Sequence, residues 1–465
     1  MRPAALRLVP ALGVLIAALA SCGGGGSQAK STAGSTPPPA STATSTPARS
    51  SQAAAWLTYD RDLSRTGLDP TSPALGRVRH AWTTALDAKV YAQPLVAGAR
   101  VIAATERNSL YALSAATGRV LWQAKLGTAV SGSSLPCGNI DPSGITATPV
   151  IDAGRSTVYA VGFIRPAHHV LFAVNLATGR VRWRRAIDPP GADPRVHQQR
   201  SALALSRGRV YVSYGGLFGD CGNYHGWVVS APASGPRGAL QAFEVPTRRE
   251  GAIWATSGPS VDGQGNVFVS TGNGSSTSSF DFGNSVIRLS SSLRRTAFWA
   301  PRNAASLSGH DTDLGSTGPV LLPGGRVFII GKEGVGYLLN AARLGGIGGQ
   351  LTSRLVCGAA FGASAYSSGL VYAACVDGLV ALRTGAGLAR AWRGPGFRAG
   401  PPIVAGGAVW TVDLGGGTLY ALDARTGRVR FHAGIGSPAQ FTSPAAAAGS
   451  IYVGGGSRVV AFTGA

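Results

Sequence analysis

The stretch YALSAATGRVLW, residues 111–122, has two further copies in the chain, FAVNLATGRVRW at 172–183 and YALDARTGRVRF at 420–431. Each copy begins with alternating aromatic, small and apolar residues, which is the pattern of a half-buried β-strand. A Thr-Gly turn follows, and each copy ends on a large aromatic residue. Three copies with one internal spacing indicate a repeated structural unit.

A second pattern supplies the other half of this unit. It consists of a proline or small residue, a short apolar strand, a glycine-containing turn and a valine or isoleucine that begins the next strand. The pattern occurs eight times, and its branched residues are 38 to 60 residues apart, which is the length that four short strands and their turns need. We therefore predict an all-β chain that folds as an eight-bladed β-propeller. The branched residues are Val101, Val158, Val210, Val267, Val327, Val371, Val409 and Ile451.

The two ends of the repeat region predict how the ring closes. The last repeat ends with VVAFTGA at 459–465, before its fourth strand, whereas a strand outside the repeats, HAWTTAL at 80–86, precedes the first one. Closing a ring removes exposed sheet edges, which otherwise favour aggregation. We expect the N-terminal strand to complete the C-terminal blade.

The beginning of the chain predicts export. Residues 1–21 combine Arg2 and Arg7 with an apolar run that is too short to span a bilayer stably. This arrangement is typical of a secretion signal, and the alternative is a buried N-terminal strand.

The residues that follow predict a lipid anchor. LASC at 19–22 resembles the lipobox of bacterial lipoproteins, in which the cysteine, here Cys22, becomes the lipidated residue. Residues 22–54 are mostly Gly, Ser, Thr, Ala and Pro, so we predict a lipidated flexible linker ahead of a propeller domain over 55–465. The resemblance implies attachment to the cell membrane, with the folded part outside the cytoplasm.

Four further cysteines agree with export. Cys137, Cys221, Cys357 and Cys375 form an even set, and an oxidising compartment favours pairing. Of the three connectivities we favour Cys137–Cys221 and Cys357–Cys375, since each would join neighbouring or identical blades; four buried thiols are the alternative. No spacing is CxxC, so a structural zinc site is not expected.

The chain is strongly basic, with a formal net charge of +22. Such a charge on an exported domain would attract anionic lipid head groups or anionic wall polymers at short range. The export signal and the lack of a base-stacking motif argue against nucleic acid as a partner. Arginines scattered over the blade rims, with no specific partner, are the alternative.

The repeats resemble the tryptophan-docking repeats of the pyrroloquinoline quinone (PQQ) propeller superfamily, in which the terminal aromatic residue packs between adjacent blades. The resemblance covers residues 80–465. The superfamily holds both quinoprotein dehydrogenases and non-catalytic scaffolds that resemble the outer-membrane assembly lipoprotein, so the fold does not decide between these functions.

Two stretches resemble the metal site of the dehydrogenases. VFVSTGNGS at 267–275 is similar to the stretch that places an asparagine on calcium, which implies that role for Asn273. GHDTDLGS at 309–316 resembles the motif whose aspartate is both a calcium ligand and the proposed general base, which implies Asp311. Calcium with oxygen ligands polarises a carbonyl, and a carboxylate nearby can remove the proton of an alcohol.

Two further stretches resemble the quinone site. IGKEGVGYLL at 330–339 is similar to the strand that carries a cation beside the quinone carbonyls, which implies Lys332. AIWATS at 252–257 lies where the enzymes have a tryptophan under the quinone ring, which implies Trp254. A planar tricarboxylate needs an aromatic floor and cations. Packing between blades and exposed turns are the structural alternatives for these residues.

The sequence also departs from the enzymes. They have a metal-binding glutamate in the second repeat, but 161–174 contains no acidic residue, and no two cysteines are adjacent. The loop GLFGDCGNYHGWVVS at 216–230 offers His225 as an acid-base candidate, and a disulfide-pinned cover over a blade end is the favoured alternative.

Two functions follow from these residues. The first is a membrane-anchored lipoprotein whose propeller is a binding or scaffold module for an envelope protein or an anionic wall polymer. The second is a PQQ-dependent, calcium-assisted alcohol or sugar dehydrogenase that uses Asp311 as its catalytic base. We favour the first, and we expect a monomer without a nucleic-acid partner.

Overall fold

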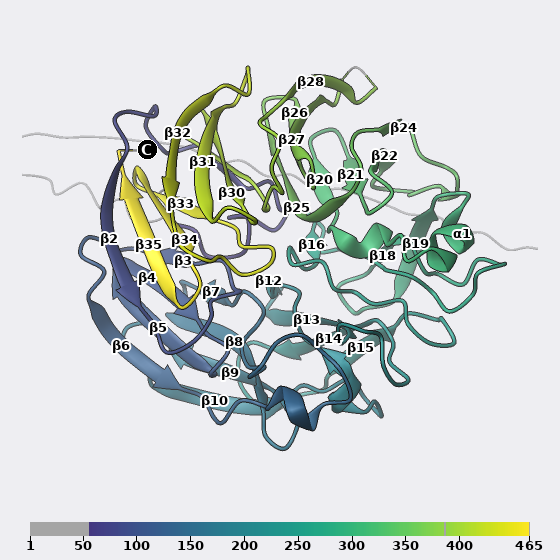
Figure 1. Cartoon of the computed structure of the whole chain (residues 1–465). Coiled ribbons are helices and arrows are strands. Elements are labelled where there is room, and N and C mark those ends of the chain that lie inside the picture. Colours follow the sequence, from purple (N-terminus) through teal and green to yellow (C-terminus); the bar gives the residue numbers. More distant parts are fainter. Residues whose placement is uncertain (1–54, 386, 465) are drawn as a thin grey trace, which may run out of the picture. The chain divides into compact units, whose positions relative to one another are not determined.

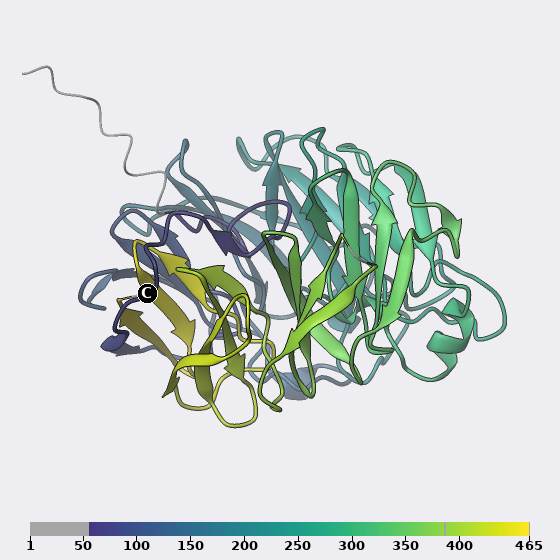
Figure 2. The same ribbon diagram turned by 90° about the horizontal axis from the view of Figure 1, so that it is seen from above.

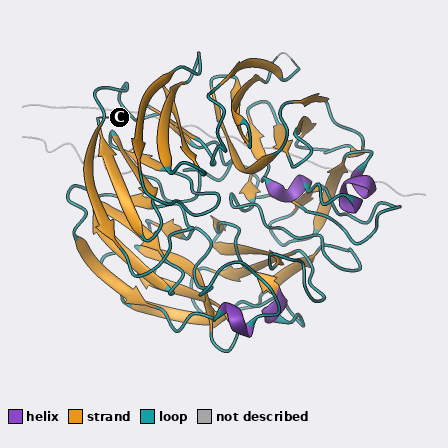
Figure 3. Ribbon diagram, viewed as in Figure 1, coloured by secondary structure: helices purple, strands orange, loops and turns teal. Residues whose placement is uncertain are grey.

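The computed structural model describes residues 55–385 and 387–464. The predicted signal peptide, the lipidation site Cys22 and the linker therefore lie outside the described residues. The described chain forms a ring of eight sheets built almost entirely of strands (Figures 1 and 3). The predicted eight-bladed propeller is confirmed.

The first four blades follow one another around the ring (Figure 1). Blade 1 has β3 (Leu95–Ala97), β4 (Arg100–Ala104), β5 (Ser109–Ser114) and β6 (Val120–Lys125). Blade 2 has β7 (Val150–Asp152), β8 (Thr157–Ile164), β9 (His168–Asn175) and β10 (Val181–Ala186). Blade 3 has β12 (Ala204–Ser206), β13 (Arg209–Gly216), β14 (Trp227–Pro232) and β15 (Gln241–Glu244), with β11 (His197–Gln198) beside β13. Blade 4 has β16 (Ser260–Val261), β17 (Val267–Ser270), β18 (Val286–Leu289) and β19 (Arg295–Ala300), with β23 (Gly346–Ile347) beside β19.

The other four blades complete the circuit. Blade 5 has β20 (Val320–Leu322), β21 (Arg326–Ile330), β22 (Val335–Asn340) and β24 (Thr352–Leu355). Blade 6 has β25 (Ala360–Ser367), β26 (Leu370–Cys375), β27 (Gly378–Arg383) and β28 (Ala389–Arg393). Blade 7 has β29 (Ile403–Ala405), β30 (Ala408–Asp413), β31 (Thr418–Asp423) and β32 (Val429–Gly434), with β1 (Leu68–Asp69) beside β29. Blade 8 has β33 (Ala445–Ala447), β34 (Ser450–Gly454), β35 (Arg458–Thr463) and β2 (Arg79–Ala85). The helical elements described are α1 (Ala304–Gly309) and the 3-10 turns Gly132–Ser134, Pro194–Val196 and Leu314–Ser316.

The ring closes as the sequence predicts. Strand β2 pairs antiparallel with β35, from Arg79 opposite Thr463 to Ala85 opposite Arg458. The eighth sheet therefore contains both ends of the propeller, and its purple and yellow strands lie side by side in Figure 1. All eight branched residues that define the repeat lie in the second strand of a blade, and each is fully buried.

The repeated Thr-Gly turn is a docking site for an indole. The indole nitrogens of three tryptophans donate to the carbonyl three residues before the turn glycine of the next blade, over 3.0 to 3.1 Å. A Cβ atom on the turn glycine Gly427 would lie 2.6 Å from the ring of Trp392, so the turn needs a glycine for close approach. The pairs are Trp82 with Ala115, Trp122 with Leu176 and Trp392 with Ala424.

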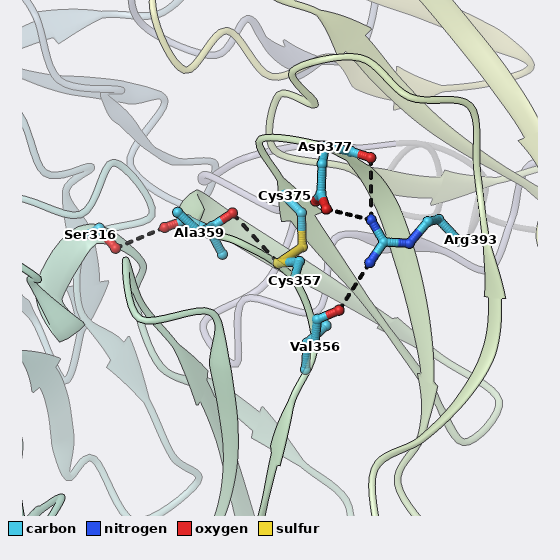
Figure 4. Close-up of a disulfide and its surroundings, with 8 residues drawn as sticks. Ser316, Val356, Cys357, Ala359, Cys375, Asp377 and Arg393 are labelled. Atoms are coloured by element: carbon cyan, nitrogen blue, oxygen red, sulfur yellow. Dashed lines mark hydrogen bonds and ion pairs between the residues drawn. A yellow bond between two sulfur atoms is a disulfide. The ribbon is translucent and has the colours of Figure 1, made fainter.

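Both favoured disulfides are present. Cys137 pairs with Cys221, and Cys357 pairs with Cys375. The second bond lies where blade 6 begins, beside an ion pair between Arg393 and Asp377 (Figure 4). Among the described residues, no helix has the length and apolar character to cross a membrane.

Residues 55–69, which we call the axial segment, have a role that the repeat pattern did not predict. This segment runs around the inner ends of the blades and accepts backbone hydrogen bonds from the innermost strands of six of them. Its Arg65 side chain also donates to the carbonyl of Leu203, which precedes the innermost strand of blade 3. The six donors are Val96, Ile151, Val261, Leu321, Tyr366 and Val404.

The antiparallel order of each blade gives the ring two different ends. The turns between first and second strands and between third and fourth strands lie at one end, which we call the turn face. The turns between second and third strands and the connections between blades lie at the other end, the pocket face. The axial segment contacts the innermost strands close to the turn face. Leu75, which follows this segment in the chain, donates to the carbonyl of Gly406 in a turn of that face. Figure 2 shows the blades from the side, with this purple segment along one end of them.

Candidate functional site

The four residues implied by the quinoprotein resemblance line one cavity of about 470 Å³ on the pocket face. Trp254 belongs to the connection between blades 3 and 4, and Asp311 to the connection between blades 4 and 5. Asn273 follows β17, and Lys332 lies in the turn between β21 and β22. The propeller topology brings such connections and turns to the same end of the ring. The cavity has the size of a small-molecule site.

Lys332 is the centre of a network of charged groups. Its ammonium nitrogen lies 2.8 Å from Asp311 Oδ1 and 2.5 Å from Asp313 Oδ2. The amide nitrogen of the Asn273 side chain donates to Asp311 Oδ1 over 2.9 Å, and its backbone N–H donates to Asp313 Oδ1 over 2.9 Å. Asp313 was not predicted as a site residue, although it lies two residues after Asp311 in the same motif.

The two carboxylates that share Lys332 differ in environment. The Asp311 side chain is 75% exposed, whereas that of Asp313 is 9% exposed. Burial raises the pKa of the Asp313 carboxyl, and the nearby Lys332 charge offsets part of that rise. Burial alone would lower the pKa of Lys332, but the charge of Asp313 and its hydrogen bonds to both aspartates raise that pKa above its usual value. Lys332 is therefore held as an ammonium group at the cavity wall.

Aromatic side chains form another part of the cavity wall, beside Lys332. The Trp254 ring lies 6.1 Å from the Phe441 ring, and Phe441 stacks on Phe361 at 5.9 Å. The Lys332 nitrogen lies 5.9 Å from the Trp254 ring centroid. A planar aromatic ligand could therefore contact apolar ring faces and a cation at once.

Arg200 supplies a second cation that the sequence analysis missed. Its guanidinium carbon lies 4.8 Å above the Phe441 ring. Its Nε and Nη2 atoms are buried and have no hydrogen-bond partner among the described residues. Burial lowers the Arg200 pKa, while Tyr91 and Glu106 act in the opposite direction. Arg200 is one of the residues that line the cavity, and a guanidinium group favours an acceptor-rich ligand such as a carboxylate.

The same geometry does not fit a calcium ion. Calcium requires six to eight oxygen ligands, several of them from carboxylates. Here Lys332 holds oxygens of Asp311 and Asp313, and Glu250 on the cavity wall pairs with Arg249 over 2.9 Å. Within the described ranges, the acidic, histidine or cysteine side chains of the cavity nowhere bring three ligand atoms within 4.8 Å of one another. The geometry thus disfavours the metal role predicted for Asn273 and Asp311.

The glycine-rich loop at 216–230 contributes to the cavity, but not through the predicted histidine. Asp220 and Tyr224 line the cavity, and the Tyr224 hydroxyl donates to Asp220 Oδ1 over 2.5 Å. His225 is not among the lining residues, and its Nδ1 lies 3.5 Å from Glu244 Oε1. The favoured interpretation of the loop, a disulfide-pinned cover, agrees with Cys221 in its middle.

A buried carboxyl group beside this wall predicts a pH dependence of stability. Glu106 is 2% exposed; it accepts hydrogen bonds from the Gly144 N–H and the Thr146 hydroxyl, and burial raises its pKa to about 7. Between its ordinary pKa and about 7, the folded state holds a proton that the unfolded state has lost. The free energy of unfolding therefore falls as the pH rises through this window and stays low above it.

Replacing Glu106 with glutamine should remove that loss. We expect Glu106→Gln to raise the free energy of unfolding by about 3 kcal/mol near pH 8 and to change it little near pH 4. Urea unfolding of both proteins at the two pH values measures the difference. The same gain at both pH values would contradict a raised carboxyl pKa.

Comparison with known sequences assigns the chain to a family. It matches the family described as outer membrane protein assembly factor BamB over residues 76–216 and 352–465, which is more than half of the chain. The chain belongs to this BamB family. The predicted membership of the PQQ-like repeat superfamily is confirmed. The stretch between the two matched parts holds all four residues predicted for the quinone and metal sites. Comparison with curated proteins gives no significant match.

Solved structures share the fold of this BamB-family chain. Quinohemoprotein alcohol dehydrogenase from Comamonas testosteroni has a TM-score of 0.70 at 14% identity, over 88% of this chain and 80% of that one. A europium-containing methanol dehydrogenase has a TM-score of 0.70 at 14% identity, over 88% and 98%. BamB from Moraxella catarrhalis has a TM-score of 0.58 at 13% identity, over 83% and 100%. At such identities the likeness shows the fold alone.

Proposed function

We propose that this protein is a lipid-anchored binding protein of the cell envelope whose cavity takes a planar, anionic aromatic compound of the PQQ type. The observation that carries this proposal is the composition of the cavity wall, where Trp254 and Phe441 lie beside the cations of Lys332 and Arg200. Aromatic faces hold a planar ring system, and a guanidinium group binds carboxylates through two hydrogen bonds.

The anchor is part of the same proposal. The apolar run within 1–21, the LASC stretch and the linker at 22–54 support lipidation of Cys22 and a folded domain outside the cytoplasm. Two disulfides support an oxidising compartment. The family is described as outer membrane protein assembly factor BamB, and membership of it also supports an envelope protein as a further partner.

A PQQ-dependent dehydrogenase is the second candidate. It is supported by the juxtaposition of Asn273, Asp311 and Lys332, which are the residues implied by the quinoprotein motifs. The cavity does not fit the calcium ion that such an enzyme would use, because Lys332 holds the carboxylates. We therefore place ligand binding without metal ahead of alcohol oxidation.

Equilibrium dialysis of the full chain with PQQ, followed by quinone absorbance, tests the proposal. We expect saturable binding with a Kd of about 10 μM or tighter that is equal in calcium and in a chelator. Arg200→Met should weaken binding at least about tenfold, because a charge-assisted hydrogen bond is lost. The control Arg195→Met removes an arginine that is exposed and outside the cavity lining, and it should leave affinity unchanged.

Other outcomes decide against the proposal. Absence of saturable PQQ binding, or equal binding by the Arg200 and Arg195 variants, would overturn it. Binding that requires calcium and is accompanied by dye reduction with alcohols or sugars would establish the dehydrogenase instead.

A further inference from the structure

The turn face carries a ring of unpaired arginines. In six blades, the turn between the third and fourth strands holds an exposed arginine and no acidic residue. Within the part of the chain that the structure describes, none of these six arginines forms an ion pair. They are Arg119, Arg180, Arg237, Arg294, Arg343 and Arg428.

Acidic residues near the turn face already accept hydrogen bonds from nearby groups. Asp152, Asp262 and Asp423 adjoin turns of this face, and each accepts hydrogen bonds from the backbone N–H groups of its own turn. Asp152 also pairs with Arg155 over 2.9 Å. The axial segment adds Asp60, Asp62 and Asp69, together with Arg61 and Arg65.

The opposite face has a different charge pattern. Acidic side chains are frequent in its turns and connections, among them Asp188, Asp220, Asp311 and Asp313. Several of them are paired with a cation or a histidine, as Asp313 is with Lys332 and Asp188 is with His169. The net positive charge is therefore concentrated at the turn face.

The chain enters the described domain at this same face. Trp56 pairs with Val96, one residue before the end of β3, where the chain reaches the turn face. Thirty-two residues separate Cys22 from Ala55, so a lipid on Cys22 would tether the domain through its turn-face end. A tether raises the effective concentration of a surface to which the domain can bind.

We propose that the turn face docks on an anionic lipid bilayer and leaves the cavity on the pocket face open to the surroundings. The tether at the turn face depends on the lipid anchor that we proposed above. The positive charge of the turn face does not depend on that anchor. Arginine binds lipid phosphates through paired hydrogen bonds, and cations within a Debye length of an anionic surface are attracted to it. Six arginines spread over one face can contact such a flat surface at the same time.

Vesicle cosedimentation tests the proposal without the lipid. The full chain carrying Cys22→Ala is mixed with vesicles of phosphatidylglycerol and phosphatidylcholine in equal amounts, and with phosphatidylcholine alone. We expect binding to the anionic vesicles only. The triple variant Arg119→Gln, Arg180→Gln, Arg428→Gln should lower the partition coefficient at least about tenfold, and high salt should do the same.

A matched variant removes the same charge from the other face. Arg107, Arg248 and Arg398 are exposed in turns or connections of the pocket face. Their replacement by glutamine should change the partition coefficient less than about twofold. Circular-dichroism melting checks that both triple variants fold.

Three outcomes would overturn the docking surface: equal loss in both triple variants, equal binding to neutral vesicles, or binding to a soluble polyphosphate without binding to vesicles. Mass spectrometry of the protein from membranes tests Cys22 separately. An unmodified Cys22 would refute the anchor and leave the vesicle result as the measure of the turn face.

Discussion

Replacing Arg65 with methionine is expected to lower the free energy of unfolding by about 3 to 5 kcal/mol. The Arg65 side chain is fully buried in the axial segment. It donates to the carbonyls of Tyr59, Leu203 and Pro259 and to the Thr58 hydroxyl, over 2.7 to 3.1 Å. Methionine has a similar length but no donors, so four buried acceptors would lose a partner.

Asp60 adds to this effect. It is fully buried, burial raises the pKa of its carboxyl well above the usual value, and the Arg65 charge opposes that rise. Removing the arginine would leave Asp60 without its compensating charge, which raises the cost of ionising it inside the protein.

Urea unfolding near neutral pH measures the change, with Arg77→Met as the matched control. Arg77 follows the same segment in the chain but is exposed, so its loss should change stability by less than about 0.5 kcal/mol. A loss at Arg65 no larger than at Arg77 would mean that the axial segment does not stabilise the ring.

Most of the architecture could be predicted because short local sequence patterns specify the strands and turns of each blade. A branched residue after a glycine turn marks the second strand of a blade, and Val101 and Ile451, the first and last of them, are both fully buried there. The axial segment could not be predicted in this way. It makes only a few hydrogen bonds to each of many different blades, and such contacts impose no periodicity on residues 55–69.

The site was predictable only in part, for a similar reason. Asn273, Asp311 and Lys332 stand in motifs, and the ring brings them together. The Arg200 guanidinium carbon lies 4.8 Å from the Phe441 ring centroid although 240 residues separate the two in the chain, and no local pattern marks either one. The prediction for His225 relied on residue type alone, and the fold directs that side chain toward Glu244 rather than toward the cavity lining.

The seam between blades 8 and 1 is the other position where one side chain should have a large effect. Trp82 belongs to β2, the strand that completes blade 8, and its indole nitrogen donates to Ala115 of blade 1 over 3.0 Å. Trp82 is 7% exposed, and its indole lies over Gly118, where a Cβ atom would come within 2.6 Å of the indole. One side chain thus joins the N-terminal strand, the C-terminal blade and the first blade.

Trp82→Ala is therefore expected to lower the free energy of unfolding by about 3 to 5 kcal/mol, measured by urea unfolding and thermal melting. The matched control is Trp183→Ala, the same substitution at the corresponding position of blade 2. Trp183 is only half-buried, and it does not belong to the strand that joins the two ends of the ring. Its loss should cost about half as much. If both variants lose the same amount of stability, burial of Trp82 at the seam stabilises the propeller no more than Trp183 does. Closure of the ring by β2 would then contribute no more than any other contact between blades.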